Sequence, residues 1–162
     1  MRIFVIRDLT DRSDKDLAYM FYDKTDRQFR IELPGNADPW ETPLLLSSFV
    51  KRGIFSVDPH WSLLWVRQRI VPIDRQNIAQ ILRDNGLKEY DEFSLLMLAS
   101  GKCAQDDYYL TEITAAQLPW DIARRIINMD YEVLITQGGM NRAEKTDEES
   151  VEGLYQSGQK SR

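Results

Sequence analysis

The sequence predicts a single α+β domain over residues 1–137 and a flexible polar tail at 138–162. In this class a small antiparallel sheet near the N-terminus is packed by four or five helices. Three observations predict it. Short apolar runs with strand-like alternation come first, and capped segments with helical spacing follow. The last part of the chain is polar and contains few large apolar side chains.

The strands are predicted from short runs rich in Ile, Val, Phe and Tyr. In the run QFRIEL, Phe29, Ile31 and Leu33 alternate with polar residues, which is the pattern of a half-buried strand. The turn DKTDR before it has the length of a hairpin connection. The segments predicted as strands are 2–7, 17–22, 28–33, 108–113 and 131–136.

Two helix starts are predicted where a capping side chain precedes proline. Thr42–Pro43 has this form, and the helix it starts ends at the next glycine. Asp58–Pro59 has the same form. The segment 59–70 places Trp61 and Trp65 on one face of a helix, which favours a helix. Its Leu, Val and Ile residues leave a strand as the alternative.

Three further helices are predicted downstream. Asp74 caps the first, which finishes at Gly86 in the manner of a Schellman motif. Asp91 caps the second, whose apolar side chains face inward as far as Leu98. The third opens around Pro119 and carries Ile122, Ile126 and Met129 on one side.

The composition indicates a soluble protein of the cytoplasm. The net charge of −5 disfavours broad binding to nucleic acid, because phosphate contacts need Lys and Arg. A single cysteine excludes an internal disulfide and is consistent with a reducing compartment. The apolar run at the N-terminus is too short for a signal peptide, and no segment approaches the ~20 apolar residues of a membrane span.

Few residues are suited to catalysis or metal binding. The one histidine, His60, and the one cysteine, Cys103, lie far apart in the sequence. A structural zinc site normally uses four such ligands, so no metal and no cofactor are predicted. A cysteine nucleophile also needs an oriented base. A small enzyme built around Cys103 is therefore an alternative, and the favoured interpretation is a buried Cys103, a surface His60 and no enzymatic activity.

A second alternative is a DNA-associated regulator or an accessory protein of a mobile element. Residues 75–85 and 91–99 have the length of a helix-turn-helix. The second of these segments opens with Asp91 and Glu92, where a reading helix makes its base contacts. Phosphate repulsion there argues against direct reading, so nucleic acid is expected only through a complex. The arginines available for this role are Arg67, Arg69, Arg75 and Arg83.

A group of tryptophans and arginines is the candidate site for a protein partner. Both residue types are enriched at the energetic centres of protein interfaces. The alternative interpretation is that the tryptophans belong to the core and the arginines to solvated edges. The predicted partner-binding residues are Trp61, Trp65, Arg67, Arg69 and Arg75.

One stretch, RIVPIDRQNIAQILRDNGLKEYDEFSLLMLASGKCA, resembles the N-terminal subdomain of HipA-type serine/threonine kinase toxins. Upstream, FRIELP is similar to the family's strand ending in Leu-Pro, so the resemblance covers about residues 29–104. Lys102 and Gln105 depart from an Asp and a Gly of the family motif. The matching positions are Val71, Pro72, Arg75, Gly86, Phe93, Leu95, Leu96, Gly101, Cys103 and Ala104.

The resemblance implies a binding role rather than catalysis. In some HipA-type systems this subdomain is a separate small protein, a HipS-like antitoxin, which binds the kinase and restrains it. The family's catalytic residues have no recognisable counterpart here. We therefore expect a non-enzymatic protein-binding module whose partner is a HipA-like kinase. Trp61 or Trp65 would enter a cleft, and neighbouring arginines would pair with acidic residues at its rim.

Overall fold

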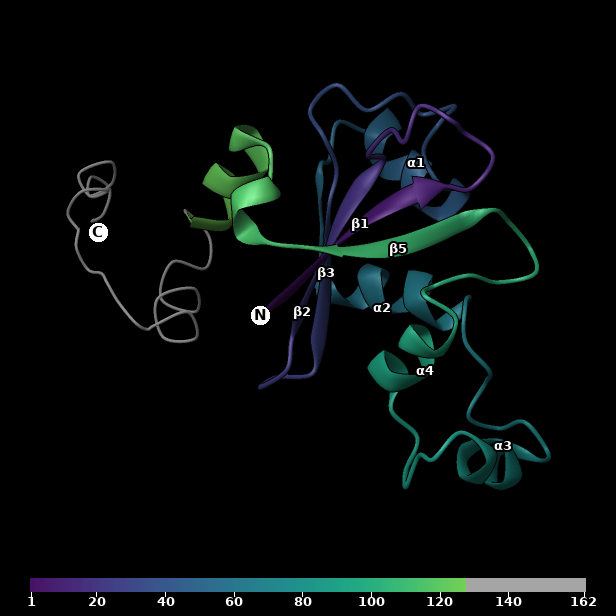
Figure 1. Cartoon of the computed structure of the whole chain (residues 1–162). Coiled ribbons are helices and arrows are strands. Elements are labelled where there is room, and N and C mark those ends of the chain that lie inside the picture. The colour runs from purple at the N-terminus through teal and green to yellow at the C-terminus, as the bar shows by residue number, and fades with distance from the viewer. Residues whose placement is uncertain (128–162) are drawn as a thin grey trace. The chain divides into compact units, whose positions relative to one another are not determined.

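The computed structural model describes residues 1–127, which contain a five-stranded antiparallel sheet and several helices (Figure 1). This confirms the α+β class. The described chain divides into a compact unit from Arg2 to Gln117 and a second unit that begins at Leu118. In the second unit, residues 120–127 are helical, as the sequence predicts. Met129, the predicted strand at 131–136 and the predicted tail at 138–162 lie outside the described residues.

The sheet has the strand order β4-β3-β2-β1-β5, and every neighbouring pair is antiparallel. The first strand of the chain therefore lies inside the sheet, between β2 and the last strand. The register pairs Ile6 with Ala18 on one side and with Leu110 on the other. The strands are β1 (Arg2–Asp8), β2 (Ala18–Asp23), β3 (Gln28–Glu32), β4 (Ser56–Val57) and β5 (Tyr108–Ile113).

Four α-helices belong to the unit that contains the sheet. They are α1 (Leu44–Lys51), α2 (Pro59–Arg67), α3 (Ile78–Asp84) and α4 (Glu92–Leu98), and a short 3₁₀ turn spans Ala115–Gln117. The segment after Asp58 is thus a helix, and the alternative of a strand is excluded. Helix α3 lies away from the sheet in Figure 1 and buries none of its residues.

The core lies between one face of the sheet and helices α1, α2 and α4. Phe4 and Met20 face each other across β1 and β2, and their side chains belong to one cluster with residues from all three helices. Leu46 comes from α1, Trp65 from α2 and Leu96 from α4. Full burial of each such side chain contributes about 1.5–3 kcal/mol to the free energy of unfolding, so this contact holds the helices to the sheet.

Two of the predicted helix caps are present. The Asp58 carboxylate accepts a hydrogen bond from the Trp61 amide at 2.9 Å, and the Asp91 carboxylate accepts one from the Ser94 amide at 2.9 Å. Each bond satisfies a backbone donor that has no partner within the helix. The predicted finish of α3 is also confirmed, because the Leu87 amide donates to the Leu82 carbonyl at 2.8 Å.

Two other predicted caps are wrong. The Thr42 hydroxyl donates to the Asp38 carbonyl at 2.8 Å, and Pro43 takes the cap position of α1. Helix α3 begins at Ile78 rather than beside Asp74, because the chain before it forms turns. The inward orientation predicted for Leu98 is wrong as well, since this side chain is 52% exposed at the end of α4.

Candidate functional site

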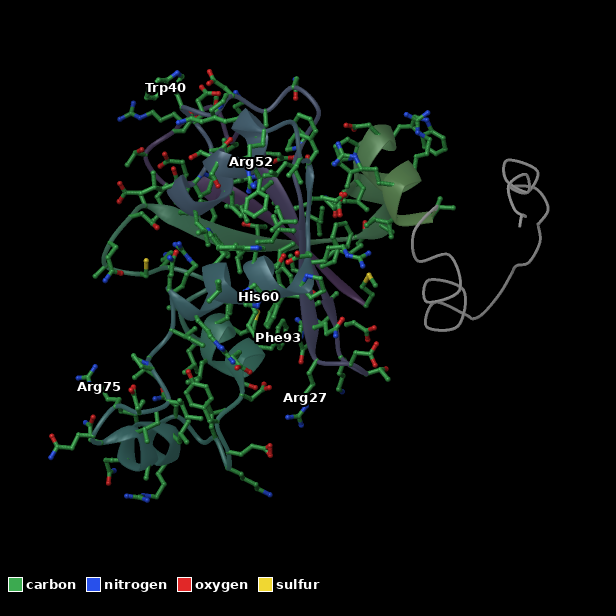
Figure 2. All side chains as sticks on the ribbon, turned by 180° about the vertical axis from the view of Figure 1, so that it is seen from behind. Arg27, Trp40, Arg52, His60, Arg75 and Phe93 are labelled. Atoms are coloured by element: carbon green, nitrogen blue, oxygen red, sulfur yellow. The ribbon has the colours of Figure 1, made fainter. Side chains whose placement is uncertain are left out.

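Aromatic and basic side chains form a connected surface around the end of α1 and the start of α2. Trp40 is 90% exposed and Trp61 is 38% exposed, which is unusual for residues of this size. Figure 2 shows Trp40, Arg52 and His60 following one another along one face of the molecule. We call the following residues the aromatic–basic surface: Trp40, Phe49, Lys51, Arg52 and Trp61, of which Phe49 is buried.

Cation–π and ring contacts join these residues in two groups, Trp40 with Lys51 and Phe49 with Arg52 and Trp61. The Lys51 ammonium lies 5.5 Å from the centre of the Trp40 ring, and the Arg52 guanidinium lies 4.9 Å from the centre of the Phe49 ring. The Phe49 and Trp61 rings meet edge to face, with centroids 5.8 Å apart. These are attractive geometries for such pairs, so the contacts limit the freedom of the exposed rings.

The local sequence explains why Trp61 is held at the surface. Asp58 fixes the first turn of α2 through its bond to the Trp61 amide, and Trp61 projects from this turn beside α1. His60 packs edge to face on Trp61 with ring centroids 5.5 Å apart. Trp61 is therefore clamped between Phe49 and His60 while more than a third of its surface remains open to solvent.

Trp40 is held by the loop that precedes α1. Its amide donates to the Asp38 carboxylate at 2.9 Å, and the Thr42 amide donates to the Asp38 carbonyl at 3.1 Å. These bonds make a compact turn, and the indole ring on it is 90% exposed. The Lys51 ammonium at the end of α1 lies over this ring.

The surface carries two cations, Lys51 and Arg52, although the carboxylates of Asp38, Glu41 and Asp58 lie next to its tryptophans in the sequence. Among residues 1–127, neither Lys51 nor Arg52 forms an ion pair with a carboxylate. Both cations lie at the C-terminal end of α1, where the helix dipole favours positive charge. The surface thus offers aromatic area and two uncompensated cations to an acidic partner.

The five residues that the sequence indicated for partner binding do not form one surface. Trp61 belongs to the aromatic–basic surface. Arg67 is exposed and donates to the Glu92 carboxylate at 3.1 Å. Arg75 is exposed at the opposite end of the molecule from Trp40, as Figure 2 shows. The prediction that Trp65 binds a partner is wrong, because this residue is 1% exposed and lies in the core.

The prediction that Arg69 binds a partner is also wrong, because this side chain connects the end of α2 to the loop before β5. Its guanidinium donates to both Asp106 carboxylate oxygens, at 2.6 and 2.9 Å, and to the Gly101 and Tyr108 carbonyls. It also lies 4.5 Å from the centre of the Trp65 ring. With a side chain only 2% exposed, Arg69 fulfils a structural role and is not available to a partner.

Asp106 is ionised in this arrangement over a wide pH range. Partial burial alone would raise its pKa, but hydrogen bonds from Arg69 and from the Tyr108 amide outweigh burial. The pKa of Asp106 is therefore lowered from its ordinary value, with a smaller contribution from a hydrogen bond that the Cys103 thiol donates. The expectation of a buried Cys103 is wrong, because this side chain is partly exposed, whereas His60 is exposed as expected and packs on Trp61.

The described residues provide no other obvious chemical centre. Within residues 1–127, no group of three or more His, Cys, Asp or Glu side chains is placed to hold a metal ion. No helix in this part of the chain combines the length and apolar character needed to cross a membrane. Of the arginines considered for DNA contact, Arg69 is buried, Arg67 pairs with Glu92 and Arg83 bonds to Gln80.

Sequence reasoning missed most of the aromatic–basic surface. One signal for Trp40 was available: the segment around it is rich in Pro, Gly and Asp, so it offers no periodic apolar face that would bury a tryptophan. Phe49, Lys51 and Arg52 carried no comparable signal, because their roles depend on how α1 packs against α2.

Comparisons with protein-family models, with curated proteins and with solved structures found no match to this chain.

Proposed function

We propose that this chain is a non-enzymatic protein-binding module that resembles an antitoxin and restrains a HipA-type kinase. The observation that carries the proposal is the exposed, clamped Trp61 in the aromatic–basic surface. Tryptophan and arginine dominate the energetic centres of interfaces, and rigid aromatic rings lose little conformational entropy on binding. The resemblance of residues 29–104 to a HipA-type subdomain supports the choice of partner.

The proposed mechanism is occlusion of a cleft on the kinase. Trp61 and Trp40 supply the apolar area that enters the cleft, and their ring contacts hold them in place before binding. Lys51 and Arg52 then pair with acidic residues at the rim of the cleft. A surface of this kind speeds the encounter with an acidic partner and fixes its orientation, because complementary charges steer diffusion.

The decisive experiment is a calorimetric titration of this chain against a purified HipA-type kinase. Replacement of Trp61 by alanine should weaken binding by about 30-fold, since a tryptophan at the centre of an interface contributes about 2 kcal/mol or more. Kinase autophosphorylation, measured in the same mixtures, should recover with the loss of binding.

The matched control is Ile73→Ala, which also removes an exposed apolar side chain but lies outside the aromatic–basic surface. This control should bind within about twofold of the wild type. Equal affinities of the Trp61→Ala variant and the wild type, with both folded by circular dichroism, would show that the surface is not the contact. Absence of binding to the kinase by the wild type would refute the proposed partner.

A further inference from the structure

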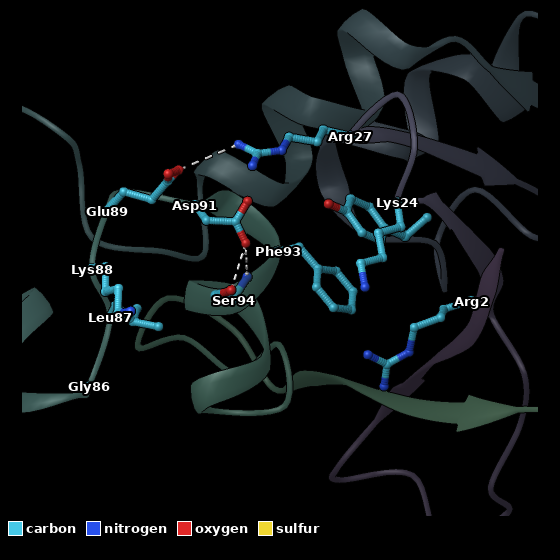
Figure 3. Close-up of a pocket in the computed structure, with 11 residues that line it drawn as sticks. Arg2, Lys24, Arg27, Gly86, Leu87, Lys88, Glu89, Asp91, Phe93 and Ser94 are labelled. Atoms are coloured by element: carbon cyan, nitrogen blue, oxygen red, sulfur yellow. Dashed lines mark hydrogen bonds and ion pairs between the residues drawn. The ribbon is translucent and has the colours of Figure 1, made fainter.

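A cavity of about 630 Å³ lies beside the aromatic core, away from the residues of the aromatic–basic surface. Its walls come from the start of β1, the turn between β2 and β3, and the segment that joins α3 to α4 (Figure 3). The volume falls within the range of ordinary ligand sites. The charged residues that line it are Arg2, Lys24, Arg27, Lys88, Glu89 and Asp91.

Several of these charges already have partners. Arg27 lies 3.8 Å from the Glu89 carboxylate, and Arg2 forms a double hydrogen bond with Glu112 outside the cavity at 2.8 and 2.9 Å. Asp91 accepts hydrogen bonds from the amide and the hydroxyl of Ser94. Lys24 and Lys88 remain, and neither has an ion pair with a carboxylate among residues 1–127.

An apolar wall separates these two lysines. The Phe93 ring stacks on the Tyr22 ring with centroids 4.1 Å apart and planes 7° from parallel. The Arg2 guanidinium lies 5.1 Å from the centre of the Phe93 ring. The half-buried Phe93 ring is therefore held in place by Tyr22 and Arg2, and it lies between the two positive charges.

We infer that this cavity binds an extended acidic peptide segment of another protein. Figure 3 shows Lys24 and Lys88 on opposite sides of the cavity, so their charges suit carboxylates spaced along a chain rather than one compact anion. Phosphate sites commonly use free backbone amides at a helix start. Here Asp91 already occupies the amide of Ser94 at the start of α4, which disfavours a phosphate group.

The test is fluorescence anisotropy of a fluorescein-labelled hexaglutamate peptide titrated with the full chain at low salt. The wild type should bind hexaglutamate and not the matched hexaglutamine peptide. Lys24→Glu and Lys88→Glu should each weaken binding by about fivefold or more, because each reverses a charge that lines the cavity. Raising the ionic strength from about 0.05 M to about 0.5 M should abolish binding.

One control tests whether weaker peptide binding is caused only by the change in net charge, and a second tests whether the proposed kinase contact binds the peptide. Lys102→Glu makes the same charge change at an exposed position outside the cavity and should leave affinity within about twofold. Trp61→Ala should also leave it unchanged, so the two proposals fail independently. Equal weakening by all three lysine variants would overturn the inference. Equal binding of the two peptides, or displacement of the peptide by inorganic phosphate at the concentration at which unlabelled hexaglutamate displaces it, would do so as well.

Discussion

Replacement of Arg69 by methionine should destabilise the protein strongly, because its buried guanidinium makes several hydrogen bonds. Methionine keeps an unbranched side chain but removes the guanidinium, which lies 4.5 Å from the centre of the Trp65 ring. The variant loses two hydrogen bonds to the Asp106 carboxylate and one hydrogen bond to each of the Gly101 and Tyr108 carbonyls. These bonds connect α2 with the loop that leads into β5, so the variant should loosen that connection.

The size of the expected loss in free energy of unfolding follows from the burial of the Arg69–Asp106 ion pair. Breaking a buried ion pair by removing one partner costs about 3–5 kcal/mol, because the remaining charge is left without compensation. Asp106 is 31% exposed and retains the Tyr108 amide, so water relieves part of that cost. We therefore expect a loss of about 3 kcal/mol in the free energy of unfolding. With a urea m-value of about 2 kcal/mol/M, the midpoint should fall by about 1.5 M.

Urea unfolding followed by tryptophan fluorescence measures this change directly. The matched control is Arg67→Met, two residues earlier, whose exposed side chain makes a single surface pair with Glu92. That variant should change the free energy of unfolding by less than about 1 kcal/mol. A loss below about 1 kcal/mol for Arg69→Met, or equal losses for the two variants, would show that the Arg69 bonds do not hold α2 to the loop.

Three further outcomes are expected. Gly101→Ala should lower the free energy of unfolding by about 2–3 kcal/mol, because the new Cβ would lie 2.7 Å from Leu110 Cγ and the backbone has φ +76°. Gly53→Ala, with φ +73° and open space, should lower it by only about 1–2 kcal/mol. Equal losses of stability in thermal melts would refute the clash with Leu110. Because the pKa of Asp106 is lowered in the folded state, this carboxylate stabilises the fold above the pKa of about 3.9 that it has in the unfolded chain, and the contribution is lost as the pH falls through the folded pKa. The difference in free energy of unfolding between the wild type and Asp106→Asn should therefore narrow below about pH 4 in urea titrations. A difference that stays constant with pH would contradict this. Asp91→Ala should cost about 1 kcal/mol through loss of the cap of α4, and an unchanged melting temperature would count against that cap.

The sequence was sufficient for elements whose signals are local. The strand at β3 and the caps of α2 and α4 are written into a few neighbouring residues, and the structure confirms them. The half-buried alternation predicted for β3 is wrong at Glu32, which is fully buried. Strand β4 was missed because its two residues carry no pattern of their own. It is held by pairing with β3, where Ile31 lies opposite Val57. Asp74 shows the converse case, in which a good capping residue is followed by turns instead of a helix.

The candidate site was less predictable because it depends on packing. Trp61 and Trp65 lie one turn apart on the same helix, and their spacing gives no indication of which is buried. The structure places Trp65 in the core and leaves Trp61 beside α1. Arg67 and Arg69 likewise differ only in what lies opposite them: Glu92 at the surface for one, and the buried edge of the Asp106 loop for the other.

The position of β1 has a consequence for synthesis on the ribosome. This strand is made before the other strands of the sheet, yet one of its two edges pairs with β5, which is made about a hundred residues later. Until then, the backbone groups along that edge lack their partner and are open to pairing with other nascent chains. Formation of this contact brings together distant parts of the chain, which slows folding. A message truncated before the codons for β5 should therefore yield a product that aggregates or needs a chaperone.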